Sequence, residues 1–357
     1  MVKIDLITGF LGSGKTTFIK KYAEYLIGQG MNIGILENDY GAVNVDMMLL
    51  QDLMGEKCEL EMVSGGCDKE THRRRFRTKL ISMGMCGYDR VIVEPSGIYD
   101  VDEFFDVLRD DPLDRWYEIG SVIAVADATL EEHLSAEADY LLASEVSSAG
   151  CVILSKTDLA NEEDKRNTIA HLNHALAGIG CKRVLEGDEI LEKTADSMTD
   201  ADFERIMAVG YKQASYRKMD VTEEDFTSLY FLELHKNVQE LGEAARQILA
   251  DPACGHVFRI KGFAKEDGWK QINATRDHML TADVAEGQEV LIVIGENLQK
   301  KRSKHICCKE ILFIFWKKMY NIDSIGNEGT AFPDKYFKRR RVLKWETNMQ
   351  EHRQKRT

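Results

Sequence analysis

A glycine-rich segment near the N-terminus has the residue types and spacing of a phosphate-binding loop. Residues 9–16 read Gly-Phe-Leu-Gly-Ser-Gly-Lys-Thr, which fits the pattern G-x-x-x-x-G-K-[ST]. Glycines in this pattern let backbone N–H groups turn inward around a phosphate, and a helix that follows points the positive end of its dipole at the same place. The segment predicts a site for nucleotide phosphates, but it does not separate an ATPase, a GTPase and a kinase.

The residues of this loop have expected roles toward a nucleoside triphosphate. Lys15 would reach the β- and γ-phosphates, and the hydroxyl of Thr16 would hold Mg²⁺. The residues expected to bind the phosphates and the metal ion are Gly9, Gly12, Ser13, Gly14, Lys15, Thr16 and Thr17.

Glu94 ends an apolar run over residues 90–94 and is followed by a Pro-Ser-Gly turn that closes at Gly97. An acidic side chain at the carboxyl end of such a strand can anchor Mg²⁺ through water, so Glu94 joins Lys15 and Thr16 as the expected catalytic group. The backbone N–H of Gly97 can lie near the γ-phosphate and sense it. The alternative is an ordinary turn without such a role.

The segment Ser155-Lys156-Thr157-Asp158 indicates which base the nucleotide carries. It follows the apolar run over residues 151–154. A carboxylate there can accept hydrogen bonds from both N1–H and the N2 amino group of guanine, whereas adenine offers no such pair of donors. Asp158 would therefore read guanine, and Lys156 would lie along the plane of the base. The alternative is that Asp158 only caps the helix expected over residues 161–171.

Apolar runs and helical periodicity alternate along the first half of the chain. Runs that fit strands buried on both faces of a parallel sheet lie at residues 3–8, 33–36, 90–94, 121–126 and 151–154. Helices are expected between them, at residues 15–27, 101–108 and 130–142. This alternation predicts an α/β fold, with a doubly wound and mostly parallel sheet over residues 1–185.

A second, smaller domain is expected after a polar connector. Residues 186–215 are acidic, with a helical piece over 201–209, and are expected to form that connector. Expected strands at 227–234, 256–263, 269–274 and 289–294, with a helix at 238–249, predict a small α+β domain over residues 216–298. Residues 299–357 form a basic and aromatic tail whose pattern assigns it to neither domain.

The composition disfavours several classes of protein. The chain has 357 residues, of which 44% are hydrophobic and 30% are charged, as in an ordinary globular protein. We expect neither a membrane protein nor a secreted one, because no apolar run approaches the roughly 20 residues of a membrane-spanning helix. The formal net charge of −13 disfavours nucleic acid as a partner. The cysteines are expected to be thiols or metal ligands.

Three segments together resemble the CobW family of GTPases, which includes relatives of the nickel-insertion GTPases of urease and hydrogenase. They are the glycine-rich loop, Glu-Asn-Asp-Tyr-Gly at 37–41, and Glu-Pro-Ser-Gly at 94–97. Residues 155–159 are similar to the family's base-recognition element, with Ser155 in place of Asn. Residues 258–263 are similar to the Arg-x-Lys-Gly-Phe signature of the CobW C-terminal domain. The resemblance covers about residues 3–298 and implies GTP, Mg²⁺ and the handling of zinc, cobalt or a related ion.

One motif departs from the family's pattern. The family typically has Cys-x-Cys-Cys after a glycine, whereas residues 64–70 here read Ser-Gly-Gly-Cys-Asp-Lys-Glu, so that Cys67 matches only the first cysteine. A site of three thiolates is therefore not present locally. A mixed site would still suit Zn²⁺ or Co²⁺, and its candidate ligands are Cys67, Glu37 and His72, with Cys58 and Cys86 as further candidates. Alternatively, Cys67 is a small residue in a turn.

The sequence thus predicts a cytoplasmic GTPase of the CobW type that acts as a metallochaperone or metal-insertion factor. Its partner would be an unidentified client metalloprotein or cofactor-dependent enzyme. No arginine finger or catalytic glutamine is evident, so slow intrinsic hydrolysis is expected. Two alternatives remain: a GTP-driven switch that activates a client enzyme without carrying metal, and a P-loop kinase, which Asp158 disfavours.

Overall fold

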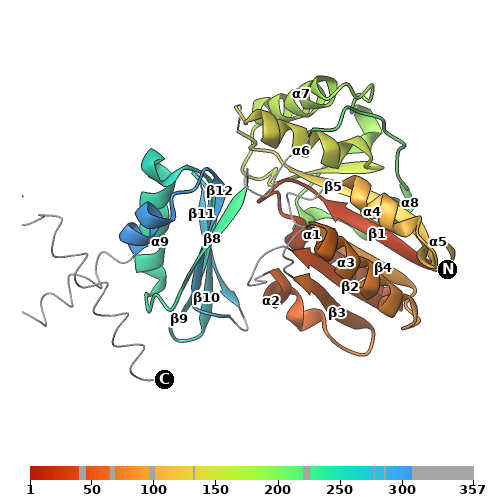
Figure 1. The fold of residues 1–357 in the computed structure, drawn as a ribbon, viewed down its shortest axis with the longest axis horizontal. Coiled ribbons are helices and arrows are strands. Elements are labelled where there is room, and N and C mark those ends of the chain that lie inside the picture. The colour runs from red at the N-terminus through yellow and green to blue at the C-terminus, as the bar shows by residue number, and fades with distance from the viewer. Residues whose placement is uncertain are drawn as a thin grey trace, which may run out of the picture. The chain divides into compact units, whose positions relative to one another are not determined.

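Parallel strands in the order β3-β2-β4-β1-β5-β6-β7 form the first sheet (Figure 1). The structure is a computed structural model that describes residues 1–39, 46–64, 69–95, 101–131, 133–219, 226–276, 278–284 and 287–307. The strands of this sheet are β1 (Val2–Thr8), β2 (Ile33–Asp39), β3 (Cys58–Ser64), β4 (Arg90–Pro95), β5 (Tyr117–Asp127), β6 (Cys151–Ser155) and β7 (Ile190–Glu192). The predicted doubly wound α/β fold is confirmed.

Helices cover both faces of this sheet because its central strands are apolar on both sides. In β4, Val91 and Val93 pack into the core of one face and Ile92 into the core of the other. The helices on the first face are α3 (Lys69–Gly84), α4 (Val101–Leu108), α6 (Ala136–Ser147) and α7 (Glu162–Gly178). Those on the second are α1 (Lys15–Gly28) and α8 (Asp200–Ala208). Two shorter helices are α2 (Asp46–Leu50) and α5 (Leu113–Trp116).

An antiparallel sheet in the order β11-β10-β9-β12-β8 follows in the chain (Figure 1). Its strands are β8 (Thr227–Leu232), β9 (His256–Lys265), β10 (Trp269–Ala274), β11 (Met279–Val284) and β12 (Val290–Glu296). Helix α9 (Val238–Ala250) packs on one face through a buried stripe that includes Leu241, Ala245 and Ile248. The predicted small α+β domain is therefore present.

A β-bulge in β9 changes the direction of two side chains. Val257 and Arg259 pair with consecutive residues of β12, so Phe258 is the extra residue between them. Val257 and Ile260 pack in the core under α9, whereas Phe258 belongs to the core of the first domain. A Cβ on Gly295, opposite the bulge, would lie 2.1 Å from a carbonyl oxygen of β9, so this position requires glycine. The bulge thus presents Phe258 and Arg259 to the first domain.

Several elements differ from the prediction. Strands β3, β7 and β11 were not predicted, and each is an edge strand, which has fewer buried positions and no continuous apolar run. The helix expected over 130–142 starts later, at Ala136, because the Ser135 side chain accepts a hydrogen bond from the Ala138 N–H and caps it. Residues 186–215, predicted as a connector, contain α8 and β7, which pairs with β6. Ile306 and Cys307 pack in the core of the second sheet.

Candidate functional site

The glycine-rich loop joins the carboxyl end of β1 to the first turn of α1. Gly9, Gly12 and Gly14 have φ angles of 145°, 85° and 98°, a region of backbone conformation that favours glycine. A Cβ on Gly9 would lie 2.2 Å from the carbonyl oxygen of Val125 in β5, so the loop is tightly packed. The first turn of α1 carries no acidic side chain, so its N-terminus is open to an anion.

Lys15 is held across this loop. Its side chain is 8% exposed, and Nζ donates a hydrogen bond to the carbonyl oxygen of Gly9 at 2.6 Å. Ser13 is also buried, whereas Thr17 is exposed on the first turn of α1. The loop therefore brings its cation and its turn glycines together at one end of the sheet, where ligands of such folds bind.

Thr16 and Glu94 meet beside the loop. Thr16 Oγ1 donates a hydrogen bond to Glu94 Oε1 at 3.1 Å, and Glu94 is buried at the carboxyl end of β4. A hydroxyl and a carboxylate are the hard oxygen ligands that Mg²⁺ prefers. The two residues predicted to hold Mg²⁺ thus lie together, and their donor set fits that ion.

Two of the predicted ligands of a transported metal, Glu37 and His72, lie near the carboxyl ends of the strands. Glu37 on β2 lies opposite Glu94 in the register of the two strands, and both carboxyls are buried. His72, on α3, is fully buried, and its Nε2 lies 2.7 Å from Oδ1 of Asn38. Cys67 and Gly97 lie outside the described residues.

Two other candidate cysteines lie at the amino ends of the strands, away from these ligands. Cys58 begins β3, at the amino end of the strand, and Cys86 lies in the turn between α3 and β4 at that same end. Burial raises the pKa of the Cys58 thiol to about 11, which disfavours the thiolate that a metal requires. The expectation that these two cysteines could join Glu37 and His72 is wrong. Within the described ranges, no group of three or more His, Cys, Asp or Glu side chains could hold a metal ion.

The segment predicted to read the base is tied to the glycine-rich loop. Lys156, with a φ of 54°, forms an ion pair with Asp127. The hydroxyl of Ser155 lies within hydrogen-bond distance of the carbonyl oxygens of Ser13 and Ala126, and it donates to one of them. Serine at this position therefore connects β6 to the loop.

Asp158 is exposed in the turn after β6. Helix α7 begins at Glu162 and is capped by Asn161, whose side chain accepts hydrogen bonds from the N–H groups of Glu163 and Asp164. The alternative in which Asp158 caps this helix is therefore wrong, and its carboxylate is left open to a ligand.

Glu145 is a buried carboxyl behind the loop that the sequence did not single out. It lies on α6 with no exposed surface. Burial raises the pKa of this carboxyl to about 8, while the charge of Lys15 and the Gly9 N–H act in the opposite direction. The loop therefore has a buried titratable group near enough to its lysine to be affected by the charge of that lysine.

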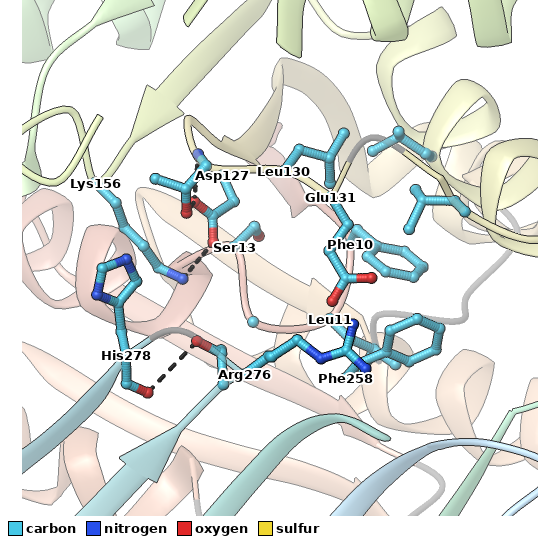
Figure 2. Close-up of a pocket in the computed structure, with 15 residues that line it drawn as sticks. Phe10, Leu11, Ser13, Asp127, Leu130, Glu131, Lys156, Phe258, Arg276 and His278 are labelled. Atoms are coloured by element: carbon cyan, nitrogen blue, oxygen red, sulfur yellow. Dashed lines mark hydrogen bonds and ion pairs between the residues drawn. The ribbon is translucent and has the colours of Figure 1, made fainter. Parts of the chain in front are cut away.

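A pocket lies between the loop, the Lys156 segment and the second sheet (Figure 2). Phe10 forms one wall, and its ring centroid lies 5.6 Å from that of Phe258. Arg276 and His278, from the turn between β10 and β11, line the same pocket. Residues from both sheets therefore border the space next to the predicted nucleotide site.

Sequence reasoning missed Asp127, Glu145 and this participation of the second sheet. Asp127 had a usable signal, because it ends the apolar run of β5 just as Glu94 ends that of β4. Glu145 had none, since a single acidic residue in a helix normally faces solvent. The contacts of Phe258 depend on a bulge, which no local pattern in the sequence reveals.

The parallel sheet, the glycine-rich loop between β1 and α1, and the Thr16–Glu94 contact define a P-loop nucleotide-binding protein. Residues 3–179 match the family model described as "CobW/HypB/UreG, nucleotide-binding domain". The nucleotide-binding domain of this chain belongs to that family, in agreement with the resemblance of its motifs.

Three curated relatives also resemble part of this chain. The chain is 28% identical over 187 residues to "Zinc chaperone YjiA" of Escherichia coli, an alignment that covers 48% of this chain and 55% of the relative. It is 25% identical over 167 residues to "Zinc chaperone YeiR" of Escherichia coli, covering 46% and 50%. It is 26% identical over 183 residues to "Zinc-regulated GTPase metalloprotein activator 1" of Schizosaccharomyces pombe, covering 48% and 44%.

These alignments leave much of each relative unmatched. The chain spans about half the length of the curated relatives it matches.

Among the residues that the structure describes, no helix is long and apolar enough to cross a membrane.

Proposed function

We propose that this chain binds GTP with Mg²⁺, hydrolyses it to GDP and phosphate, and uses the nucleotide state to control delivery of zinc or cobalt to a client metalloprotein. The observation that carries the nucleotide part is the Thr16–Glu94 contact beside the glycine-rich loop, at 3.1 Å. It joins a hydroxyl from α1 to a buried carboxylate from β4 at the point where the phosphates would end.

Each residue of the loop then has a part in binding. The turn glycines Gly9, Gly12 and Gly14 let the backbone approach the phosphates, and Ser13 and Thr17 flank them. Lys15 exchanges its hydrogen bond to Gly9 for the β- and γ-phosphates. Thr16 and Glu94 would hold Mg²⁺, which when bound neutralises charge between the β- and γ-phosphates. Gly97 would supply an N–H to the γ-phosphate.

The base would lie against the Lys156 segment. Lys156 is held by Asp127, and the aliphatic part of its side chain would then lie along the base. Asp158, exposed in the following turn, would accept both donors of guanine. The preference for GTP over ATP therefore rests on Asp158.

The transported metal would bind near the γ-phosphate. Glu37 and Glu94 are buried carboxyls on neighbouring strands, and such a pair favours a cation between or beside them. His72 contacts Asn38, the residue after Glu37 in β2, from the other face of the sheet, and Cys67 follows β3 in the chain. The names of the relatives favour zinc as the cargo. A change at the γ-phosphate would alter this ligand set and so release or capture the metal.

Metal binding by the full chain tests this proposal. Zinc and cobalt are titrated into protein loaded with GDP or with a non-hydrolysable GTP analogue, using wild type, Cys67→Ser and Cys86→Ser. We expect one metal ion per chain, an affinity that depends on the nucleotide, and a loss of binding only in Cys67→Ser. The control is Cys86, which lies at the opposite edge of the sheet. Guanine-nucleotide binding without metal binding would overturn the metal part and leave a switch that activates its client without cargo.

A further inference from the structure

Arg259 extends from the second sheet to the glycine-rich loop. It follows the bulge at Phe258 and therefore points away from α9. A Cβ on Gly12 would lie 3.3 Å from Cδ of Arg259 and 3.8 Å from its Nη1. The guanidinium group thus lies directly beside the backbone of the loop, at the second of its turn glycines.

Neighbouring residues fix the orientation of this arginine. Its Nε donates a hydrogen bond to Oδ1 of Asn273 on β10 at 2.8 Å, and its side chain is partly buried. When Nε of a guanidinium group is anchored, its two terminal nitrogens can both point at one ligand. These two nitrogens form a planar fork that matches pairs of phosphate oxygens. Arg259 is therefore held in a geometry suited to phosphate.

Apolar side chains near Arg259 should strengthen the interaction of its guanidinium group with a phosphate. Phe10, the loop residue two before Gly12, packs against Phe258 and Phe226, with ring centroids 5.6 and 6.3 Å apart. The three rings are buried, so they cover one side of the loop with apolar side chains. A charge interaction is stronger in such a setting than in bulk water. Lys15 contacts the phosphate site from the helix side, and Arg259 approaches it from the second sheet.

We propose that Arg259 is a catalytic residue that binds the β- and γ-phosphate oxygens of GTP and stabilises the charge that develops during hydrolysis. This inference rests on the proposed GTPase function. In the reaction, a water oxygen forms a bond to the γ-phosphorus, and the bond from that phosphorus to the β,γ-bridging oxygen breaks. The electron pair stays on GDP, and the proton lost by the water goes to the released phosphate. Arg259 neutralises the charge gathering on the bridging oxygen, the role of an arginine finger supplied within one chain.

Single-turnover hydrolysis by Arg259→Ala tests the proposal. We expect the rate constant of GTP cleavage to fall about 1,000-fold, as for other arginine fingers. Arg259→Lys should stay impaired, because an ammonium group lacks the fork. Arg246→Ala is the control: Arg246 is an exposed arginine of the same domain, paired with Glu243 on α9.

Three further measurements separate catalysis from a purely structural role. Wild type with GDP and aluminium fluoride should form a stable transition-state analogue, and Arg259→Ala should not. Added guanidinium ion at millimolar concentration should partly restore hydrolysis to Arg259→Ala, whereas lost domain packing would not respond. Asn273→Ala should lose less activity than Arg259→Ala, since it only removes the acceptor of Nε.

The outcomes also distinguish this inference from the proposed function. If wild type hydrolyses GTP and Arg259→Ala cleaves it at the same rate, Arg259 is not catalytic and the proposed GTPase function still holds. The same conclusion follows if Arg259→Ala traps aluminium fluoride as wild type does. If wild type neither binds nor hydrolyses GTP, the proposed function itself fails.

Discussion

At the scale of single residues, polar side chains at the site have specific hydrogen-bond or ion-pair partners. Lys15 is buried against the Gly9 carbonyl, Thr16 donates to Glu94, and Lys156 pairs with Asp127. Asp158 differs from these residues because its carboxylate is exposed. An open carboxylate at the end of a strand beside a phosphate loop is suited to selecting a base.

Replacing Asp158 should change the base that is selected. In Asp158→Asn, the amide presents a donor to guanine N1–H, so GTP affinity should fall about 100-fold. Xanthosine triphosphate, which carries a carbonyl at position 2, should then bind better than GTP. Competition binding with GTP, xanthosine triphosphate and ATP checks this, and an unchanged preference for GTP would remove Asp158 from the base site.

Glu145 should make stability depend on pH. Its pKa is about 8 in the folded chain against an ordinary value of 4.5. Between these values the folded state holds one proton more than the unfolded state. The free energy of unfolding should therefore fall by about 1.4 kcal/mol per pH unit as pH rises, and level off above the folded pKa.

The variant Glu145→Gln isolates this contribution. It keeps the shape of the side chain and removes the titration, so its stability should fall less than that of wild type between pH 5.5 and 8. Denaturant unfolding at several pH values measures the difference. Parallel curves for the two proteins would mean that Glu145 is already ionised in the folded state.

At the scale of elements, a buried ion pair joins β1 to β4 at the end of the sheet away from the site. Asp5 is fully buried and accepts hydrogen bonds from Arg90 Nη1, from the hydroxyl of Tyr22 at 2.8 Å and from the N–H of Ser121 at 2.8 Å. A Cβ on Gly120 would lie 2.3 Å from Asp5 Oδ1, so the cluster leaves no room for another side chain there.

Removing Arg90 should leave Asp5 buried without its counter-charge. We expect Arg90→Leu to lose about 3–5 kcal/mol of stability, the usual cost of breaking a buried pair from one side. Nucleotide affinity should change little under conditions where the variant is folded, because the pair lies at the opposite end of the strands. A loss below about 1 kcal/mol in denaturant unfolding would contradict this role of the pair.

The elements that were predictable are those whose signal is local. The strand over 90–94 is a continuous apolar run, and the glycine-rich loop is a contiguous pattern, so both follow from the sequence. Strand β11 alternates little and is largely exposed, which hides it. The contact of Arg259 with Gly12 joins distant parts of the chain through a bulge, and long-range pairing of this kind has no local signal.

At the scale of the whole described molecule, an aromatic cluster, a set of polar contacts and the approach of Arg259 to Gly12 link the second sheet to the nucleotide-binding domain. Phe10, Phe226 and Phe258 form the cluster. Glu131 contacts His256 of the second sheet at 3.4 Å, and the hydroxyl of Ser135 donates a hydrogen bond to Glu296, which also lies 3.5 Å from His256. Because the contact between Glu131 and His256 is partly exposed, it contributes little, and the aromatic cluster should carry most of the coupling.

Truncating Phe258 should uncouple the two sheets. Phe→Ala in a buried position costs about 3–5 kcal/mol, and here the loss falls on contacts between domains. We expect wild type to unfold in one calorimetric transition and Phe258→Ala in two, with the second sheet melting first. A single transition that merely shifts to lower temperature would show that other contacts couple the domains.

The glycine-rich loop, with Thr16 and Glu94, should bind and hydrolyse GTP in the presence of Mg²⁺. The most direct measurement is phosphate release by the full chain from GTP and from ATP, with and without Mg²⁺, for wild type and Thr16→Ala. We expect phosphate release from GTP in preference to ATP, a requirement for Mg²⁺, and loss of the release in Thr16→Ala. No release from GTP, or release that Thr16→Ala leaves unchanged, would contradict it.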